Sequence, residues 1–404
     1  MCSDRSDATR IQRGGTQELR DEWVTTVFDH NRERHAWRHG HLNEVLDSVP
    51  IPARNPGELE MSPRGLPAIL HLPGTLATYL GVPPLTIERG QLLDLVGTRG
   101  LLVWHDGAIV HEEYRLGHDS TTPWMTNSAS KLVIAMLVAR AQMEGVMGQD
   151  ETPITTYWPE LSGSAWDGVT IGHCRQMTTG VGWDEEDLDL LDPESEWVVL
   201  FKELTRGSID SYPGTVPRRD EPGEVVWYSS LDTEVLGGTL IRAASEGIAE
   251  LVERWLWTPM RAESDAYWIC DPTGREFALS GLNATLRDYT RLGILLLNHG
   301  RAFGQQLLPE AFCRKLEQPD PGLLSAPGAD AYPVTVWEQA FVPNTLEAQD
   351  GDYMAAGSFN QIIYVSPRTR TVVAHHGVTA DITTEYIDMF RLFMAFREIG
   401  HSLL

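Results

Sequence analysis

The residues with the clearest chemical potential are Ser128 and Lys131, which form a Ser-x-x-Lys pattern. In a helix, an offset of three residues puts both side chains on one face of one turn, within reach of each other. The pattern opens a stretch that is apolar on almost every side up to Gly145, which predicts a helix buried in a large core. An ammonium at the edge of a dry core loses hydration, so its pKa falls and it can accept a seryl proton or promote its loss to another base. We therefore predict Ser128 as a nucleophile and Lys131 as its activating partner.

Chance is the alternative explanation for so short a pattern. The chain has only three lysines, Lys131, Lys202 and Lys315. With serine at about 7% of residues, the probability of any match is about 0.2, and the position at the start of a core helix lowers it several-fold. A functional pair is favoured.

A tyrosine downstream strengthens this interpretation. Tyr228 lies just ahead of a stretch predicted to be helical from Thr233. Tyrosine is a poor base at its free pKa near 10, but a neighbouring ammonium favours the phenolate. Lys131 could supply that charge, which would make Tyr228 the proton shuttle between Ser128 and a leaving group. Core packing is the alternative for any single tyrosine.

Local patterns predict the elements that must position these residues. Two hairpins are expected, one over 101–114 with an Asp-Gly turn and one over 361–375, and helices are expected over 233–247, 248–257 and 386–404. A capping box of Thr285 and Asp288 predicts another helix from Tyr289 to Leu297. Strands near both ends of the chain and helices between them predict one sheet assembled from both ends, with a helical lobe inserted.

The predicted domain organisation follows from this order. Residues 1–35 are charged and aperiodic, and are expected to form a flexible N-terminal arm. Residues 36–404 are expected to form one domain, with a sheet lobe over 36–127 and 300–404 and a helical lobe over about 128–299. The fold class is α/β (α+β), an antiparallel sheet flanked by helices.

Four segments occur in the order found in the class C β-lactamase-like, penicillin-recognising serine hydrolases, namely 128–131, 170–180, 228–230 and 281–288. From about residue 36 to its end the chain resembles that family, including residues 41–45. It most resembles the branch of 6-aminohexanoate-oligomer amidases and related carboxylesterases. The resemblance implies the β-lactamase/transpeptidase-like fold.

The resemblance also implies roles for individual residues. Ser128 would be the acylated nucleophile, Lys131 its partner and Tyr228 the general acid and base. The family's oxyanion hole uses the N–H of the nucleophile and one from the strand that follows its third motif. That strand is expected to begin near residues 357–361, which makes the Gln361 N–H the second donor.

Two departures from the family pattern bear on the substrate. Ser230 stands where the second motif often has Asn, and Ser358, Phe359 and Asn360 stand where a Lys or His would open the third motif. The cation that engages a β-lactam carboxylate is therefore missing. We expect an uncharged ester or amide as substrate, contacted by Trp227, Ser230, Ser358 and Asn360, and no turnover of antibiotics.

Three further groups have simpler interpretations. His375 and His376 are adjacent on a predicted strand, so they point to opposite faces and cannot share a metal ion well. The acidic stretch 184–192 lacks the spacing of a calcium loop and is expected to be a solvated lip of the inserted lobe. Four tryptophans of that lobe are expected to pack in its core, with Trp227 the best candidate for a cleft wall; they are Trp183, Trp197, Trp227 and Trp268.

Composition narrows the partners and the location. The 404 residues carry a net charge of −25, which disfavours nucleic acid and anionic membrane surfaces as partners. The N-terminal residues lack the features of a secretory signal, and the four cysteines lack disulfide or zinc spacing, so we expect reduced thiols in a cytoplasmic protein; they are Cys2, Cys174, Cys270 and Cys313. No cofactor or metal is expected. The partner is a small-molecule substrate, and a homodimer is left open.

Three functional hypotheses remain at this level. The first is a serine hydrolase of a small ester or amide that works through an acyl-enzyme on Ser128. The second is a non-catalytic binding protein with the same fold, which the altered third motif makes credible. The third is an acyltransferase that uses the same Ser, Lys and Tyr. Substrate identity and the preference between ester and amide do not follow from the sequence.

Overall fold

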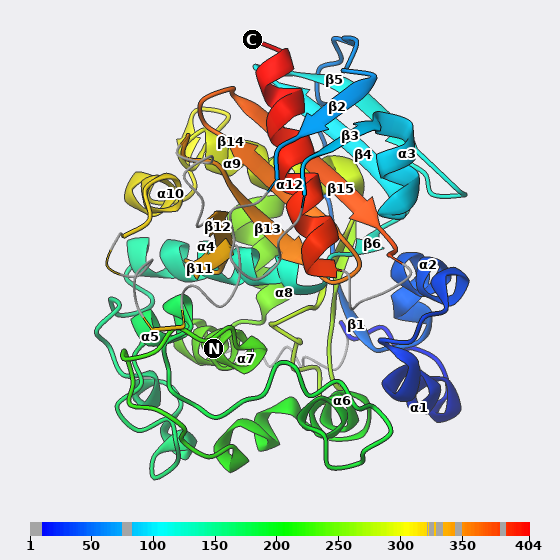
Figure 1. Cartoon of the computed structure of the whole chain (residues 1–404). Helices are drawn as coiled ribbons and strands as arrows, with labels where there is room; N and C mark the ends of the chain where they lie inside the picture. Colours follow the sequence, from blue (N-terminus) through cyan, green and yellow to red (C-terminus); the bar gives the residue numbers. More distant parts are fainter. Residues whose placement is uncertain are drawn as a thin grey trace.

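The computed structural model of the chain describes residues 10–74, 83–320, 322, 327–328, 334–343, 350–379 and 385–404. Its centre is a seven-stranded antiparallel sheet with the order β11-β12-β13-β14-β15-β4-β5 (Figure 1). The strands are β4 (Thr98–His105), β5 (Ala108–Tyr114), β11 (Val334–Trp337), β12 (Ala340–Pro343), β13 (Tyr353–Gly357), β14 (Gln361–Ser366) and β15 (Thr371–Gly377). Strand β15 pairs with β4, opposing Val373 to Val103. The prediction of one sheet assembled from both ends of the chain is confirmed.

The two predicted hairpins form for the expected local reasons. Between β4 and β5, Asp106 and Gly107 have φ values of 41° and 111°. A two-residue type I′ turn requires positive φ at both positions, and Asp-Gly is among its preferred sequences. Between β14 and β15, the chain turns through Pro367 and reaches Arg370 at a φ of 49°.

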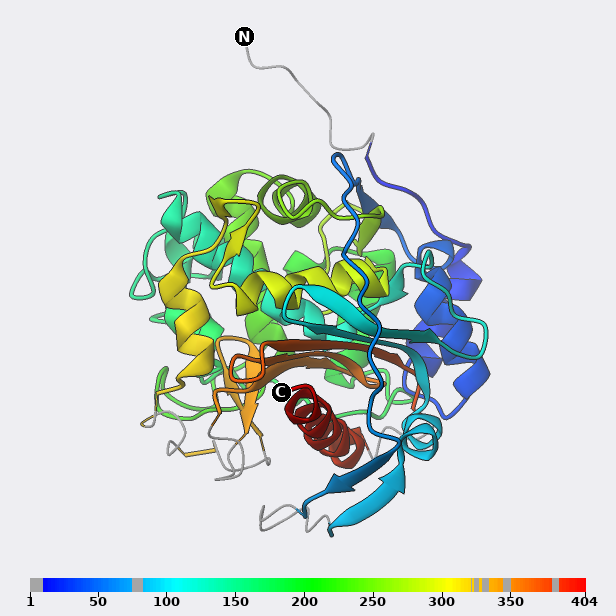
Figure 2. The same cartoon turned by 90° about the horizontal axis from the view of Figure 1, so that it is seen from above.

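Alternate residues of the sheet face two different layers of helices. On one face, Tyr364 contacts Phe393 of α12 (Glu385–Ser402), with ring centroids 5.3 Å apart. On the other face, a Cβ added to Gly293 of α9 (Leu286–Leu297) would lie 2.8 Å from Ile363, so glycine allows this helix to lie close on the sheet. Figure 2 shows α12 on one side of the sheet and the other large helices on the opposite side. The period of two in a strand explains how one strand serves both layers.

Helix α4 (Ser130–Met143) runs through the core, as its sequence predicts. It follows a short 3-10 turn, η3 (Asn127–Ala129), and its apolar side chains from Leu132 to Ala139 are buried. A helix that is apolar all round has no face that water could cover without cost, so it must be enclosed by other elements.

The remaining elements surround this core. A second antiparallel sheet has the order β1-β7-β8-β6, formed by β1 (Ser48–Ile51), β7 (Ala266–Ile269), β8 (Leu282–Ala284) and β6 (Trp124–Met125). Two strand pairs are β2 (Ile69–Leu72) with β3 (Leu85–Glu88), and β9 (Arg301–Ala302) with β10 (Gln305–Gln306). The other α-helices are α1 (Gln17–Thr26), α2 (Arg32–His41), α3 (Arg89–Leu95), α5 (Ile171–Gln176), α6 (Glu196–Arg206), α7 (Ser230–Ala244), α8 (Ile248–Val252), which continues into a π-helical turn (Glu253–Trp257), and α10 (Glu310–Glu317).

The N-terminal segment differs from the prediction of a flexible arm. Within the predicted arm, residues 10–35 contain α1 and the start of α2, and they are fixed to the body. Trp23 is 3% exposed and its ring centroid lies 4.8 Å from that of Phe201 in α6. Arg13 and Arg20 both reach the Asp47 carboxylate, at 2.8 and 2.6 Å. The prediction is wrong for residues 10–35 because long-range contacts fix a segment with little internal pattern; residues 1–9 lie outside the described residues.

Other expectations concern lobes, cysteines and membranes. Helix α9 belongs to the predicted helical lobe in sequence but packs on the large sheet, so the layers do not follow the predicted lobe boundaries. Cys174, Cys270 and Cys313 are buried free thiols, as expected, while Cys2 lies outside the described residues. Along the described parts of the chain, no helix has both the length and the apolar character needed to cross a membrane.

Candidate active site

The predicted nucleophile lies in the turn that begins the central helix. Ser128 is the middle residue of η3, between Asn127 with a φ of 47° and Ala129. Lys131, in the first turn of α4, donates from Nζ to Ser128 Oγ at 2.6 Å. The predicted contact between the two side chains of the Ser-x-x-Lys pattern is therefore present.

Burial sets the protonation of the lysine. The Lys131 side chain belongs to a residue that is 1% exposed, and this desolvation lowers its pKa to about 8. The carboxylates of Glu185 and Glu234 act in the opposite direction, because their negative charge favours the ammonium. At pH 7 about one Lys131 in ten is then neutral and able to accept a proton.

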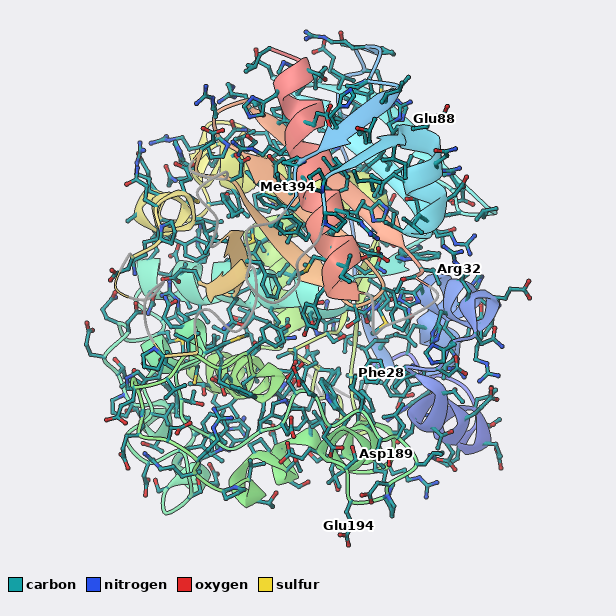
Figure 3. All side chains as sticks on the ribbon, in the orientation of Figure 1. Phe28, Arg32, Glu88, Asp189, Glu194 and Met394 are labelled. Carbon is teal, nitrogen blue, oxygen red and sulfur yellow. The ribbon has the colours of Figure 1, made fainter. Side chains whose placement is uncertain are left out.

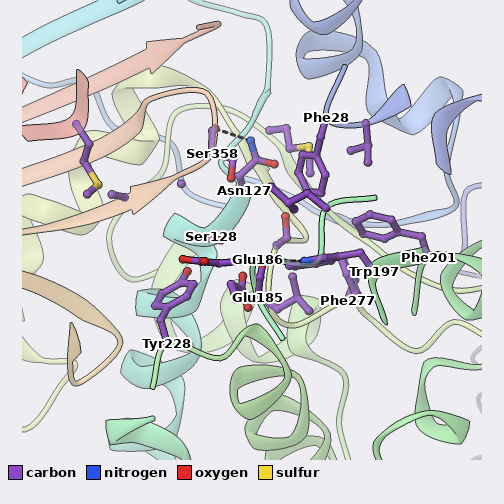
Figure 4. Close-up of a pocket in the computed structure, with 18 of the residues that line it drawn as sticks. Phe28, Asn127, Ser128, Glu185, Glu186, Trp197, Phe201, Tyr228, Phe277 and Ser358 are labelled. Carbon is purple, nitrogen blue, oxygen red and sulfur yellow. Dashed lines mark hydrogen bonds between the residues drawn. The ribbon is translucent and has the colours of Figure 1, made fainter. Parts of the chain in front are cut away.

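Tyr228 approaches the same point from the segment ahead of α7. The Lys131 Nζ lies 5.2 Å from the centroid of the Tyr228 ring, and that ring stacks on Phe341 at 5.5 Å and 22°. Tyr228 and Ser128 line one cavity (Figure 4). The structure thus brings together the three residues predicted to be catalytic.

This cavity has a volume of 340 Å³ and opens onto Ser128. Most of its lining is apolar, and aromatic rings form its largest surfaces. The rings belong to Trp23, Phe28, Trp197, Phe201, Tyr228, Phe277, Phe341 and Tyr386. Cavities of this size and character bind small organic molecules.

The end of β13 passes directly beside the nucleophile. A Cβ added to Gly357 would lie 2.9 Å from the backbone N of Ser128 and 2.3 Å from the carbonyl O of Thr126. Only glycine allows two backbones to come this close. The next residue, Ser358, lines the cavity, and its carbonyl accepts a hydrogen bond from Asn127 Nδ2 at 2.8 Å.

Two predicted site residues beyond this point lie away from the cavity. Gln361 is fully buried, pairs with Gly357 across the β13–β14 hairpin, and donates from Nε2 to the carbonyl of Gly377 at 2.8 Å. Asn360 is 1% exposed and donates to the carbonyl of Val96. The prediction placed the start of a strand where the structure has a hairpin turn, so the residues beside Ser128 are Gly357 and Ser358 and not Gln361 and Asn360.

Trp227 and Ser230, which were predicted to contact the substrate, are not among the residues that line the cavity either. Trp227 lies under the guanidinium of Arg219, 4.4 Å from its ring centroid. Ser230 is buried, and its Oγ donates to Glu185 Oε1 at 2.6 Å. Trp197 is buried in the core, as expected, and it also lines the cavity.

The acidic stretch 184–192 has two environments. Asp189 and Asp192 are exposed, and Figure 3 shows Asp189 and the nearby Glu194 at the rim of the molecule, as expected of a solvated lip. Glu185 instead faces inward and accepts from the backbone N of Ser230 at 2.8 Å and from Trp183 Nε1 at 2.6 Å.

Glu185 and its neighbour Glu186 both line the cavity. Our sequence analysis missed them. The signal available was Ser230 itself, because its short side chain leaves room for a carboxylate.

The two adjacent histidines of β15 do face opposite sides. His375 contacts Thr98 Oγ1 at 2.8 Å and lies near Phe396 of α12, whereas His376 Nδ1 lies 3.1 Å from His118 Nε2 on the other face. Burial lowers the pKa of His375 to about 4 and that of His118 to about 4, so both are neutral packing residues near pH 7.

A model of the family described as Beta-lactamase matches residues 94–376. The chain belongs to the β-lactamase family. The β-lactamase/transpeptidase-like fold predicted from the sequence is confirmed, and membership of this family makes the protein a serine hydrolase.

Similar proteins agree with this assignment. The 6-aminohexanoate-dimer hydrolase of Paenarthrobacter ureafaciens is 26% identical over 369 residues, covering 87% of this chain and 86% of that protein. A solved structure from Bacillus anthracis, named for the same activity, shares 23% identity with a TM-score of 0.78 and covers 94% of this chain and 96% of its own. EstCE1, a hydrolase with promiscuous acyltransferase activity, shares 15% identity with a TM-score of 0.58, covering 76% of this chain and 96% of its own. These structures share the fold of this β-lactamase-family chain.

Proposed function

We propose that the protein hydrolyses a small, uncharged ester or amide through an acyl-enzyme on Ser128. The observation that supports this most directly is the 2.6 Å contact between Ser128 Oγ and the buried Lys131 Nζ. A lysine whose pKa is lowered to about 8 can accept the seryl proton near neutral pH.

In the first half of the reaction, Ser128 Oγ attacks the substrate carbonyl carbon while its proton passes to Lys131. The oxyanion that forms accepts hydrogen bonds from the backbone N–H groups of Ser128 and Ser358, which replaces Gln361 as the second donor. The close approach of Gly357 to Ser128 supports this pairing. When the carbon–oxygen or carbon–nitrogen bond breaks, Tyr228 donates a proton to the departing alcohol or amine and is reprotonated by Lys131.

In the second half, water attacks the acyl carbonyl. Its proton passes through Tyr228 and Lys131 to Ser128 Oγ as the ester bond to the enzyme breaks, and the acid is released. This restores the starting protonation of every group, so the cycle is balanced without a cofactor.

The cavity favours uncharged substrates. No Lys, Arg or His is among its described lining residues, whereas Glu185 and Glu186 are. A carboxylate like that of a β-lactam would therefore be desolvated beside two acids with no cation to pair with it. The name of the Paenarthrobacter ureafaciens relative supports an open-chain amide, as opposed to a β-lactam, as the bond that is cleaved.

Acyl transfer is the second candidate, because EstCE1 shares the fold and is described as having promiscuous acyltransferase activity. A mostly apolar cavity could favour an organic acceptor over water. Adding small alcohols or amines to a p-nitrophenyl ester assay and following the products distinguishes the two: a new ester or amide at the expense of free acid supports transfer.

Ser128→Ala tests the proposal. We expect it to lower kcat/KM for p-nitrophenyl acetate by about 10³-fold or more and to abolish labelling by a fluorophosphonate probe. Ser162→Ala, at an exposed serine outside the cavity, is the matched control and should behave as wild type. A wild-type protein that neither hydrolyses p-nitrophenyl acetate nor is labelled would support the non-catalytic alternative. Turnover that persists in Ser128→Ala would contradict the role of Ser128, and Ser128-dependent hydrolysis of benzylpenicillin or nitrocefin would contradict the uncharged-substrate assignment.

A further inference from the structure

One end of the cavity is a wall of aromatic rings contributed by segments far apart in sequence. Trp23 in α1 and Phe28 just after it meet Trp197 and Phe201 of α6. The ring centroids of Phe28 and Trp197 are 5.8 Å apart, and those of Trp197 and Phe201 are 5.3 Å apart. We call these four residues the aromatic wall. Rings at such distances form a continuous apolar surface that another ring can join.

The N-terminal half of this wall lies outside the part of the chain that matches the family model. That match begins at residue 94, whereas Trp23 and Phe28 belong to the segment held by Asp47. Because the segment is fixed to the body, its rings are preorganised and need not be ordered when a ligand binds.

The position of the aromatic wall relative to Ser128 and Tyr228 indicates which end of the substrate it contacts. In Figure 4, Tyr228 lies on one side of Ser128, and Phe28, Trp197 and Phe201 lie on the other. In the proposed function Tyr228 protonates the leaving group, so the leaving group occupies its side. The acyl group of the substrate must then extend toward the aromatic wall.

Charge restricts what this acyl group can carry. Glu185 and Glu186 line the same cavity as the wall and Ser128, and Phe277 adds to its apolar surface. An acyl carboxylate would be repelled by both acids. A ring or a branched hydrocarbon is compatible with the wall.

We propose that the aromatic wall is the acyl-binding site, and that it selects esters or amides whose acyl group ends in an aromatic ring or a similarly bulky apolar group without a carboxylate. This inference rests on the proposed function, because it assigns the two ends of the substrate from the roles of Ser128 and Tyr228. The site would favour a substrate such as a phenylalkanoyl ester over an acetyl ester, since apolar area leaves water only in the former case.

The test compares kcat/KM for p-nitrophenyl esters that differ only in the acyl group: acetate, 4-phenylbutyrate, succinate and 6-aminohexanoate. We expect 4-phenylbutyrate to exceed acetate by about tenfold or more, with the succinate monoester below acetate. Phe28→Ala should lower the ratio of kcat/KM for 4-phenylbutyrate to kcat/KM for acetate by about fivefold to tenfold. Trp37→Ala is the matched control, because Trp37 is an exposed aromatic residue of α2 outside the cavity, and it should leave both values unchanged.

Each failure has a separate meaning. If acetate is not hydrolysed, or its hydrolysis survives Ser128→Ala, the proposed function is wrong. If acetate is hydrolysed through Ser128 but 4-phenylbutyrate is no better, or the 6-aminohexanoate ester is preferred to it, the acyl-site assignment is wrong. Phe28→Leu keeps most of the side-chain volume and covers the case in which Phe28→Ala is unstable. It should shift the ratio in the same direction by a smaller factor, and an unchanged ratio in a folded Phe28→Leu would contradict the proposal.

Discussion

At the scale of single residues, the site depends on the interactions among Lys131, Glu185 and Ser230. Ser230 stands where the family often has a longer amide side chain, and Glu185 reaches into that space to accept from its N and Oγ. The charge of Glu185 favours the ammonium form of Lys131, whereas burial favours the neutral form. The basicity of Lys131 therefore depends on Glu185, a residue that belongs to none of the motifs found in the sequence.

This balance predicts the pH dependence of the reaction. The proposed mechanism requires neutral Lys131, so kcat/KM should rise as the pH increases through about 8, the lysine pKa set mainly by burial. In Glu185→Gln the amide can keep hydrogen bonds to Ser230 but loses the charge that favours the ammonium, so the midpoint should move to lower pH. The midpoint in each protein is measured from the rates of p-nitrophenyl acetate hydrolysis from pH 5.5 to 9.5, corrected for spontaneous hydrolysis.

Glu194→Gln removes a charge from the exposed part of the same acidic stretch and serves as the control. Its midpoint should equal that of the wild type. A midpoint in Glu185→Gln that stays fixed or rises would show that Lys131 is not the group that titrates.

Sequence reasoning succeeded where chemistry is local. Ser128 and Lys131 are one helical turn apart, so their contact follows from helix geometry. Glu185 and Phe28 could not be found in this way, because each reaches the cavity through a loop or a turn whose path depends on the whole fold. Trp227 shows that adjacency in sequence does not ensure a shared site. Tyr228 lines the cavity, whereas the neighbouring Trp227 side chain packs against Arg219.

At the scale of elements, the site is the junction of the start of α4 and the end of β13. Gly357 is the contact point, because any side chain there would meet the backbone of Thr126 and Ser128. Asn127 adds a second tie through its hydrogen bond to the Ser358 carbonyl. The junction therefore fixes the position of both proposed oxyanion donors relative to each other.

Gly357→Ala should separate these two elements. The new methyl group would lie 2.3 Å from a backbone oxygen that cannot move without shifting η3. We expect kcat to fall by about 10²-fold, in the range seen when one oxyanion donor is displaced, and the melting temperature to fall as well. Steady-state kinetics and thermal unfolding followed by circular dichroism measure the two effects.

The matched control is Gly90→Ala in α3, where an added Cβ meets nothing within 4 Å. It should retain full activity and lose no stability, because alanine is the better helix former. Wild-type kcat in Gly357→Ala would contradict the role given to the junction.

Elements with a clear local signal were predicted, and those held by distant contacts were not. The β-rich strands of both hairpins, bounded by turn residues, and the continuously apolar α4 follow from their sequences. Helix α1 has only two buried residues, the adjacent Trp23 and Val24, which is no helical period. Its structure depends on Phe201 and Asp47, which no local pattern reveals.

At the scale of the whole molecule, a single carboxylate fastens the N-terminal segment to the body. Asp47 accepts from Arg13 Nη1, Arg20 Nη2 and the backbone N of Gly14, and its own side chain is 1% exposed. Burial by itself would raise the pKa of Asp47, but the bonds from Arg20, Gly14 and Arg13 outweigh it, so the pKa is lowered. Because this segment supplies Trp23 to the cavity, its attachment matters to the site as well as to stability.

Asp47→Asn should loosen this attachment. The amide faces two guanidinium groups without a charge to pair them, so we expect the free energy of unfolding at pH 7 to fall by about 2–4 kcal/mol. The wild-type advantage is present above the unfolded-state pKa near 3.8 and is lost as the pH falls through the lowered folded-state value, so the two proteins should converge in acid. Urea unfolding at several pH values measures this difference.

Asp21→Asn tests whether removing any acidic residue of the N-terminal segment destabilises the protein as much as removing Asp47. Asp21 pairs with Arg206 on the surface of α1, and its removal should change stability little. An equal loss in both variants would mean that Asp47 has no special part in holding the segment. Limited proteolysis should cut first near α1 in Asp47→Asn only.

The pairing of β15 with β4 also has a consequence for the order of events during synthesis. These neighbouring strands are far apart in the sequence, and the hairpin of β4 and β5 leaves the ribosome long before its partner β15 exists. Until β15 arrives, one edge of that hairpin is an unpaired row of backbone donors and acceptors, which can template aggregation. The same delay applies to β13, so a nascent chain holds its serine and lysine without the strand end that would stabilise an oxyanion. If the proposed oxyanion site is correct, the nascent chain should remain inactive until β13 has been added to the sheet.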